Sequence, residues 1–95
     1  MHNITVTKTI GNETTETVVP YEFDTQEEAI EFIEYFMSDE MSSLYDELKK
    51  LGDRTTVMAI PAPHRSMRRV CEGTSRKFGR SPIEGRVEVT VNRIA

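Results

Sequence analysis

The sequence predicts a small α+β domain in which a mainly antiparallel sheet carries one long amphipathic helix on one face. Segments in which apolar and polar residues alternate lie towards both ends of the chain, and one long segment with helical periodicity lies between them. The expected order is ββαβ(α)β, in which the second helix is short and optional. With 95 residues, the chain has room for a single domain over residues 1–95 and for one modest core.

The N-terminal part of the chain is predicted to form a β-hairpin. Between residues 4 and 10, isoleucine and valine alternate with threonine, which is the period-two pattern of a strand with one buried face. Gly11–Asn12 supplies a two-residue turn, and a second β-rich stretch covers residues 14–23. Because Pro20 has no amide hydrogen to donate, we expect the second strand to lie at a sheet edge or to carry a bulge there.

A long helix is predicted over residues 25–51. Thr25 and Glu28 are spaced as in a capping box, and apolar residues recur at steps of three and four as far as Leu51. Unbroken, this helix is about 40 Å long, which exceeds the expected body of so small a domain. Either a second helix starts at Ser38–Asp39, or the overhanging half packs on a second copy of the chain. Aromatic residues broaden the apolar stripe and favour the second alternative, a homodimer through the helix 25–51.

Two further strands are predicted after the helix. Residues 55–60 form a short β-rich run, and the prolines that follow enforce an extended exit from it. Residues 86–94 alternate cleanly, with valines on the face expected to be buried. Between these strands, residues 64–72 are predicted to form one or two helical turns and residues 74–85 to form a loop.

Composition places the chain in an ordinary globular class. Hydrophobic residues make up 37% and charged residues 29% of it, which fits neither a disordered protein nor a membrane span. No apolar run approaches the roughly 20 residues that a transmembrane helix needs, and the first residues lack the pattern of a signal peptide. We therefore expect a cytoplasmic protein that does not enter a membrane.

The sequence offers no catalytic or metal-binding set. Cys71 is the one cysteine, which excludes an internal disulfide and leaves too little thiol for a zinc finger. On a shared helix, His64 and Cys71 would lie about 10 Å apart along the axis, too far for a base to activate a nucleophile. We therefore interpret Cys71 as a small buried side chain, and expect a protein that is not an enzyme and that holds no metal or cofactor.

Charge divides the chain into two halves. All but three of the 16 acidic residues precede Arg54, whereas all but three of the 12 basic residues lie from Arg54 onward. Clustered charge of this kind attracts and steers partners of the opposite sign. The alternative is that the two halves neutralise each other within the fold, and the sequence leaves both possibilities open.

The basic half contains a candidate anion or nucleic-acid site over residues 64–80. Arginine side chains and backbone amides both donate to phosphate oxygens, and an aromatic ring can stack on a base. The candidate contacts are Arg65, Arg68, Arg69, Arg76, Lys77 and Arg80, together with Phe78. The net charge of −4 and the single aromatic residue in the segment weaken this hypothesis.

The acidic half contains a candidate surface for a protein partner. Several carboxylates lie on helix positions away from the apolar stripe, where they are expected to face water. The candidate contacts are Glu27, Glu31, Glu34, Asp39 and Glu40. The leading hypothesis is a small non-catalytic regulator or inhibitor that binds a macromolecule through charged surfaces, and the competing hypothesis is a nucleic-acid or nucleotide-phosphate binding protein that uses segment 64–80.

Overall fold

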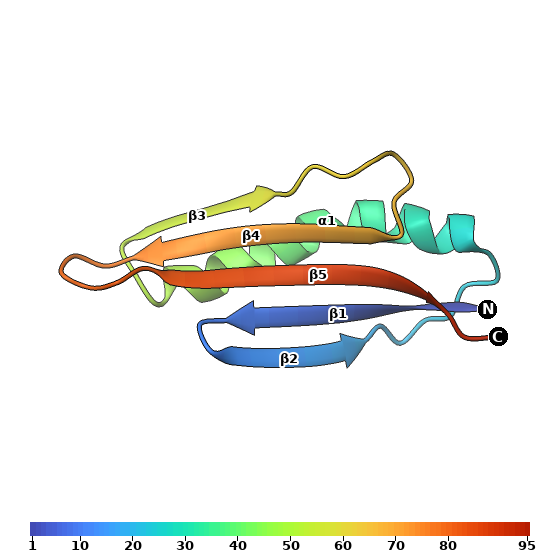
Figure 1. The fold of residues 1–95 in the computed structure, drawn as a ribbon, viewed down its shortest axis with the longest axis horizontal. Helices are drawn as coiled ribbons and strands as arrows, with labels where there is room; N and C mark the ends of the chain where they lie inside the picture. The colour runs from blue at the N-terminus through green and yellow to red at the C-terminus, as the bar shows by residue number, and fades with distance from the viewer.

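A computed structural model describes all 95 residues as one antiparallel sheet with one helix against it (Figure 1). The elements, in chain order, are β1 (His2–Ile10), β2 (Glu13–Val18), α1 (Gln26–Lys49), β3 (Arg54–Ala59), β4 (Arg68–Arg76) and β5 (Ile83–Arg93). The five strands are ordered β2-β1-β5-β4-β3 across the sheet, and all neighbours are antiparallel. The predicted fold class, an α+β domain with one long helix on one face of the sheet, is confirmed.

The strands that carry the two ends of the chain lie side by side near the middle of the sheet. β1 and β5 are neighbouring strands, in which Ile4 lies opposite Val91. Beyond them, the N-terminal ammonium group donates to the carbonyl oxygen of Ala95 at 2.9 Å, so the termini lie side by side (Figure 1). The sheet is therefore continuous only when the first and last strands are both in place.

The predicted hairpin and helix start are present. β1 and β2 are joined by the two-residue turn at Gly11–Asn12, and β2 is an edge strand that ends at Val18, before Pro20. Thr25 caps α1, because its hydroxyl oxygen accepts from the backbone amide of Glu28 at 3.2 Å. This bond satisfies one of the free amides of the first helical turn.

The prediction of a short helix over residues 64–72 is wrong. The chain forms strand β4 from Arg68 onward, with β3 on one side and β5 on the other. The predicted loop is correspondingly shorter and covers only residues 77–82. The expected burial of Cys71 is confirmed, because its side chain on β4 is fully buried under α1.

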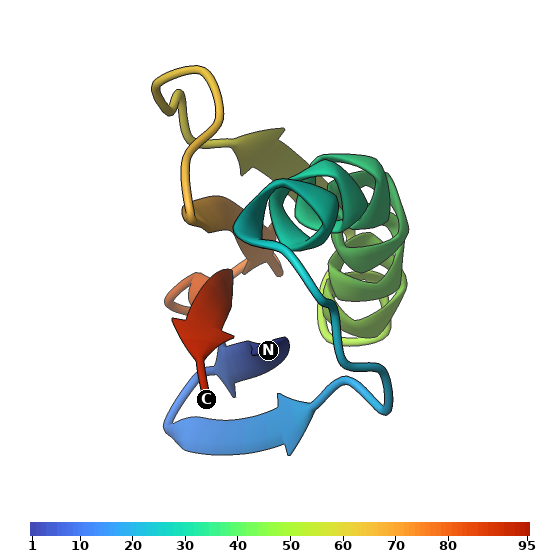
Figure 2. The ribbon, with the colours of Figure 1, turned by 90° about the vertical axis from the view of Figure 1, so that its right-hand side faces the viewer.

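α1 is one continuous helix of 24 residues, so no second helix starts at Ser38–Asp39. At about 1.5 Å per residue it is about 36 Å long, and it runs along a molecule whose longest dimension is 50 Å. Figure 2 shows that it follows one side of the sheet and leaves the other side uncovered. The overhang that favoured a second copy is therefore absent, and the homodimer remains a prediction that rests on exposed aromatic residues alone.

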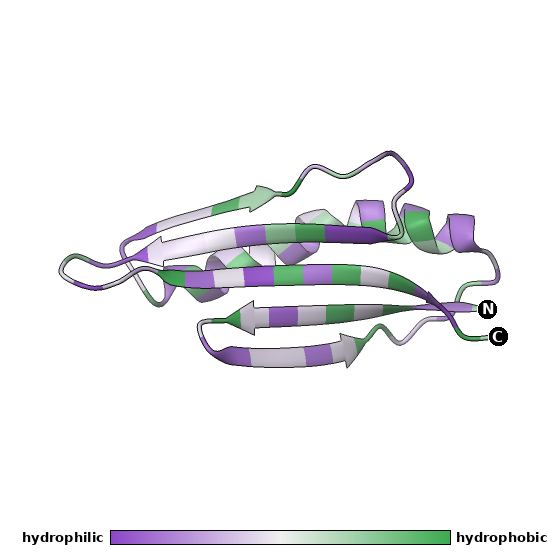
Figure 3. Ribbon diagram, in the orientation of Figure 1, coloured by the Kyte–Doolittle hydropathy of each residue, from purple (hydrophilic) through white to green (hydrophobic).

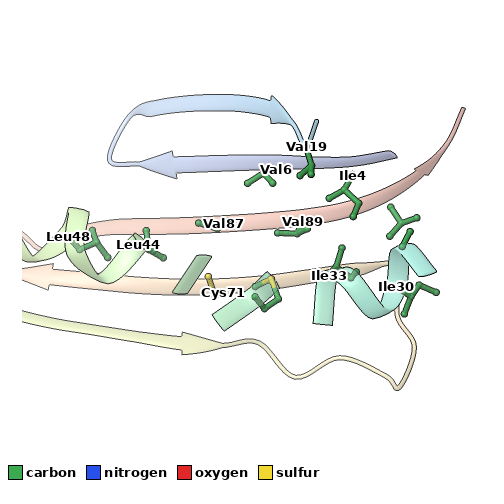
Figure 4. Close-up of a cluster of buried hydrophobic side chains, with 13 residues drawn as sticks. Ile4, Val6, Val19, Ile30, Ile33, Leu44, Leu48, Cys71, Val87 and Val89 are labelled. Atoms are coloured by element: carbon green, nitrogen blue, oxygen red, sulfur yellow. The ribbon is translucent and has the colours of Figure 1, made fainter. Parts of the chain in front are cut away.

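The core lies between α1 and strands β1, β4 and β5. Hydrophobic and hydrophilic residues alternate along β5 (Figure 3), and its alternate valines Val87, Val89 and Val91 are buried. Fully buried side chains line this layer along its length, and Figure 4 shows them in place: Ile4, Ile33, Leu44, Leu48, Cys71, Val87 and Val89. Burying aliphatic side chains is the main source of stability in a domain of this size.

Two glycines face each other beneath the C-terminal half of α1. Gly73 of β4 lies opposite Gly85 of β5. A Cβ atom on Gly73 would lie 2.7 Å from Leu48 Cδ1, and one on Gly85 would lie 2.9 Å from Leu44 Cδ1. The missing side chains therefore let the two leucines of the helix rest directly on the sheet backbone.

The structure also bears on membrane insertion. α1 is the only helix, and it has no stretch that is long and apolar enough to span a bilayer.

Candidate functional site

The opposite charges of the two halves are not paired with each other. Lys8 of β1 binds Glu47 of α1 at 2.7 Å, and both residues belong to the acidic half. The two remaining ion pairs join Glu88 to Arg68 at 2.7 Å and to Arg86 at 3.7 Å, within the basic half. Since no ion pair crosses between the halves, the acidic and basic surfaces both keep their charge exposed to solvent.

The exposed side of α1 carries the acidic candidate surface. Glu27, Glu31 and Glu34 follow one another at steps of four and three, which places them on one stripe of the helix. All three are exposed, and none forms an ion pair. Tyr35 stands beside this acidic stripe with 82% of its surface exposed. The structure thus brings three of the five acidic candidates together with an exposed aromatic ring.

The other two acidic candidates lie outside the stripe. Asp39 is exposed, but it comes five residues after Glu34, which turns it about 140° around the helix. Glu40 is half-buried beside the β1–β2 hairpin and faces Lys8. Loss of water through burial raises the pKa of Glu40; nearby Lys8 lowers it, while Asp39 raises it. Glu40 therefore lies at the edge of the buried side of α1 and not on its exposed side.

An aromatic groove separates the N-terminal half of α1 from the β1–β2 hairpin. The groove encloses about 330 Å³ and has Tyr21, Phe32 and Phe36 in its wall. Phe32 stacks on Phe36 at 5.2 Å between ring centres and meets the edge of Tyr21 at 6.1 Å. Part of the aromatic surface that favoured a dimer is therefore covered by this chain itself.

The basic segment does not form one site. β4 is nine residues long, so about 27 Å of extended chain separates Arg68 from Arg76. Arg65, Arg68 and Arg69 lie at one end of the sheet. Of these, Arg68 is paired with Glu88, and Arg69 is half-buried with no hydrogen-bond partner for its Nε. Arg65 is exposed and forms no ion pair. The second half of the segment is the stronger candidate, because all of its cations are exposed and unpaired.

The second half of the segment gathers at the β4–β5 turn, which projects from one end of the molecule (Figure 1). Four side chains with fixed positive charge lie there, none of which forms an ion pair: Arg54, Arg76, Lys77 and Arg80. We call these four residues the basic tip. With Asp53, Phe78 and Pro82 they line a hollow of about 370 Å³.

Arg54 was absent from the predicted site, because it lies ten residues before the basic segment begins. It joins the tip through strand pairing, since Arg54 of β3 lies directly opposite Arg76 of β4. The backbone amide of Asp53 extends this pairing by donating to the carbonyl of Arg76 at 2.8 Å. The sequence contains no local pattern that places residue 54 beside residue 76, so only the register of the strands reveals it.

The uncovered face of the sheet is the remaining surface of interest. It carries a polar hollow of about 500 Å³ whose lining includes Thr56, Glu72, Thr74 and Arg86. Glu72 lies opposite Arg86 in the strand register, so carboxylates and a guanidinium alternate here. This mixture gives the hollow no single charge preference, in contrast to the basic tip.

The residues considered for catalysis do not come together. His64 is exposed in the connection between β3 and β4, whereas Cys71 is fully buried on β4. Burial raises the pKa of the Cys71 thiol, which keeps it in its unreactive protonated form. No three acidic, histidine or cysteine side chains gather closely enough to hold a metal ion.

Comparison with known proteins finds no family model, no curated protein and no solved structure that matches this chain. The two charged surfaces are therefore the features of this chain that bear on its function.

Proposed function

We propose that this protein is a non-catalytic binding protein of the regulator or inhibitor kind, which contacts a protein partner through the acidic stripe of α1. The observation that carries this proposal is the absence of any ion pair between the acidic and basic halves. Carboxylates held on a rigid helix without internal partners are available to a basic surface on another molecule.

The surroundings of the stripe suit a binding surface. α1 is anchored along its length by its buried side, so the exposed side is presented with little freedom to lose on binding. Tyr35 adds a large amphipathic side chain next to Glu31 and Glu34, and tyrosine is one of the residues that most often dominates binding energy in interfaces. The charges of the acidic stripe speed association, and Tyr35 beside the stripe supplies contact area.

The test compares a helix variant with a matched control in affinity capture from a host lysate. Glu31→Lys combined with Glu34→Lys reverses two charges of the stripe and is expected to lose a protein partner that the parent retains. Reversing unpaired surface charges of this kind weakens association at least about tenfold, chiefly through slower encounter.

Glu13→Lys combined with Glu16→Lys is the control, because it makes the same change in net charge on the exposed edge strand β2. This control is expected to retain the partner. Equal capture by the helix variant and by the parent would contradict the proposal, as would equal loss in both variants.

A second candidate function is binding of nucleic acid or nucleotide phosphate. The sequence predicts this function for the whole of segment 64–80. Because the two halves of that segment lie at opposite ends of the sheet, the candidate site is reduced to the basic tip. The supporting observation is the hollow that four unpaired cations line beside Phe78. Assay of nucleic acid in the same eluates distinguishes this candidate from a protein partner.

A further inference from the structure

The basic tip contains two guanidinium groups held together without a neutralising partner. The hydroxyl oxygens of Thr55 and Ser75 lie 3.4 Å apart on the side of the sheet that faces the helix. Arg54 and Arg76 are the next pair along the two strands, and because successive side chains alternate between faces, they point to the uncovered side. Side chains directly opposite in an antiparallel pair lie about 5 Å apart, and like charges in such a pair repel. An anion bound between the two arginines removes this repulsion.

The β4–β5 turn places an aromatic ring next to these charges. The backbone amide of Arg80 donates to the carbonyl of Lys77 at 3.1 Å, which closes a tight turn. Gly79 has φ +78° at the third position of this turn, where a type II turn requires a positive φ. Phe78 therefore occupies the outer corner of the turn, and its side chain is 100% exposed.

Nothing within the chain explains this exposure of Phe78. A fully exposed phenylalanine contributes nothing to the core, and its ring stands among four cations beside the hollow of about 370 Å³. Asp53 is the one carboxylate in the lining of this hollow, and it pairs with none of the cations. The local charge therefore remains strongly positive.

We infer that the basic tip binds single-stranded nucleic acid, with Arg54, Arg76, Lys77 and Arg80 holding backbone phosphates and Phe78 stacking on a base. This inference rests on the second candidate function and does not involve the acidic stripe. Arginine forks donate two hydrogen bonds to one phosphate, which suits the paired Arg54 and Arg76. Stacking on an aromatic ring requires an unpaired base, which is why a single strand is the expected ligand.

Other anionic partners fit the tip less well. One phenylalanine supplies too little apolar area to anchor a protein on lipid, and a lipid headgroup phosphate would occupy the hollow without a base for the ring to stack on. Duplex DNA offers phosphates, but its stacked bases are closed to Phe78. An acidic peptide satisfies the arginines without using the ring. Each of these partners is an outcome that the experiment below distinguishes.

The experiment measures binding of a fluorescent oligothymidylate by fluorescence anisotropy, with the whole protein. An oligonucleotide of about 12 residues is long enough for a site of this kind. Neutralising three or four phosphates predicts a slope of about −2 to −3 when the logarithm of the binding constant is plotted against that of salt concentration. Arg76→Glu combined with Arg80→Glu is expected to weaken binding about tenfold to a hundredfold.

The matched control is Arg65→Glu combined with Arg93→Glu. It makes the same change in net charge at exposed positions outside the tip, and it is expected to leave binding within about twofold of the parent. Because the four substituted arginines are all exposed, folding of both variants is checked simply by their circular dichroism and melting temperature.

The role of Phe78 is tested separately at unchanged charge. Phe78→Ala is expected to weaken oligothymidylate binding about tenfold, and Phe78→Trp is expected to restore it. Full affinity in Phe78→Ala would overturn the stacked-base assignment and leave a simple anion site. Equal loss in the tip variant and in the Arg65/Arg93 control, tighter binding to a duplex, to an acidic peptide or to anionic vesicles, or no binding at low salt would overturn the inference. None of these outcomes affects capture of a protein through the acidic stripe.

Discussion

Leu48→Ala is expected to lower the free energy of unfolding by about 3–5 kcal/mol, the upper part of the range for buried leucine truncations. Leu48 is fully buried, and it rests on the backbone at Gly73 and Gly85. Since neither glycine has a side chain that can move into the vacated space, the cavity cannot collapse from the sheet side. The cost of such a truncation grows with the volume of cavity that remains.

Urea unfolding followed by circular dichroism measures this effect. Domains of this size unfold with about 5–14 kcal/mol, so the expected loss is a large share of the total and shifts the urea midpoint clearly. Leu51→Ala is the control, because Leu51 is 42% exposed beyond the end of the helix. The control is expected to lose less than about 1 kcal/mol. A loss below about 1.5 kcal/mol for Leu48→Ala would show that the helix does not pack as described.

Gly73→Ala is expected to destabilise the protein by about 2–3 kcal/mol, although alanine is normally the better residue within a strand. The added Cβ would lie 2.7 Å from Leu48 Cδ1, 2.8 Å from Val57 Cγ2 and 2.9 Å from the backbone oxygen of Thr56. The leucine can rotate away, but the carbonyl of the paired strand cannot move without breaking the ladder. Overpacking against backbone therefore exceeds the favourable propensity of alanine.

Gly85→Ala is the matched comparison on the opposite strand. The closest atoms to its added Cβ are leucine methyl groups, with Leu44 Cδ1 at 2.9 Å. A smaller loss is expected, and it is expected to shrink further in a Leu44→Ala background, because contacting residues couple in double-mutant cycles. Thermal or urea unfolding of the parent, the three single variants and the Gly85→Ala/Leu44→Ala double variant measures both effects. A neutral or stabilising Gly73→Ala would contradict the close approach of α1 to β4.

The elements that could be predicted from the sequence are those whose buried residues are large. β1, α1 and β5 present isoleucine, leucine or valine at regular intervals, and these intervals are visible without any knowledge of the fold. β4 was missed because its inward positions hold Cys71, Gly73 and Ser75. At Gly73 a side chain is excluded because Leu48 of α1 fills the space above it, which is a property of the packing between elements and not of β4 alone.

The predicted overhang of α1 is absent because the sheet is as long as the helix. A helix of about 36 Å overhangs a domain of average proportions, but β5 has 11 residues and extends nearly as far as the helix. The sequence shows strand length poorly, since the ends of β4 and β5 near the tip are polar. Helix and sheet therefore match in length, and no second copy is needed to cover α1.

The arrangement of the candidate site residues could not be predicted from the sequence. Residues 64–80 are contiguous in the chain, yet an extended strand carries their two halves to opposite ends of the sheet. Arg54 joins the tip only through its register with Arg76. Glu40 leaves the acidic surface because the helical rotation turns it towards Lys8. Register and rotation are set by tertiary packing, which composition and spacing do not show.

The acidic and basic halves form no ion pair with each other, so like charges repel within each surface. The most direct test is the free energy of unfolding measured by urea between about 0.01 M and 1 M sodium chloride, over which the Debye length falls from roughly 30 Å to 3 Å. Screening of the repulsion within the acidic stripe and within the basic tip is expected to raise the stability. Stability that falls steadily as salt is added would mean that attraction between the halves holds the fold together, and would rule out two independent charged surfaces.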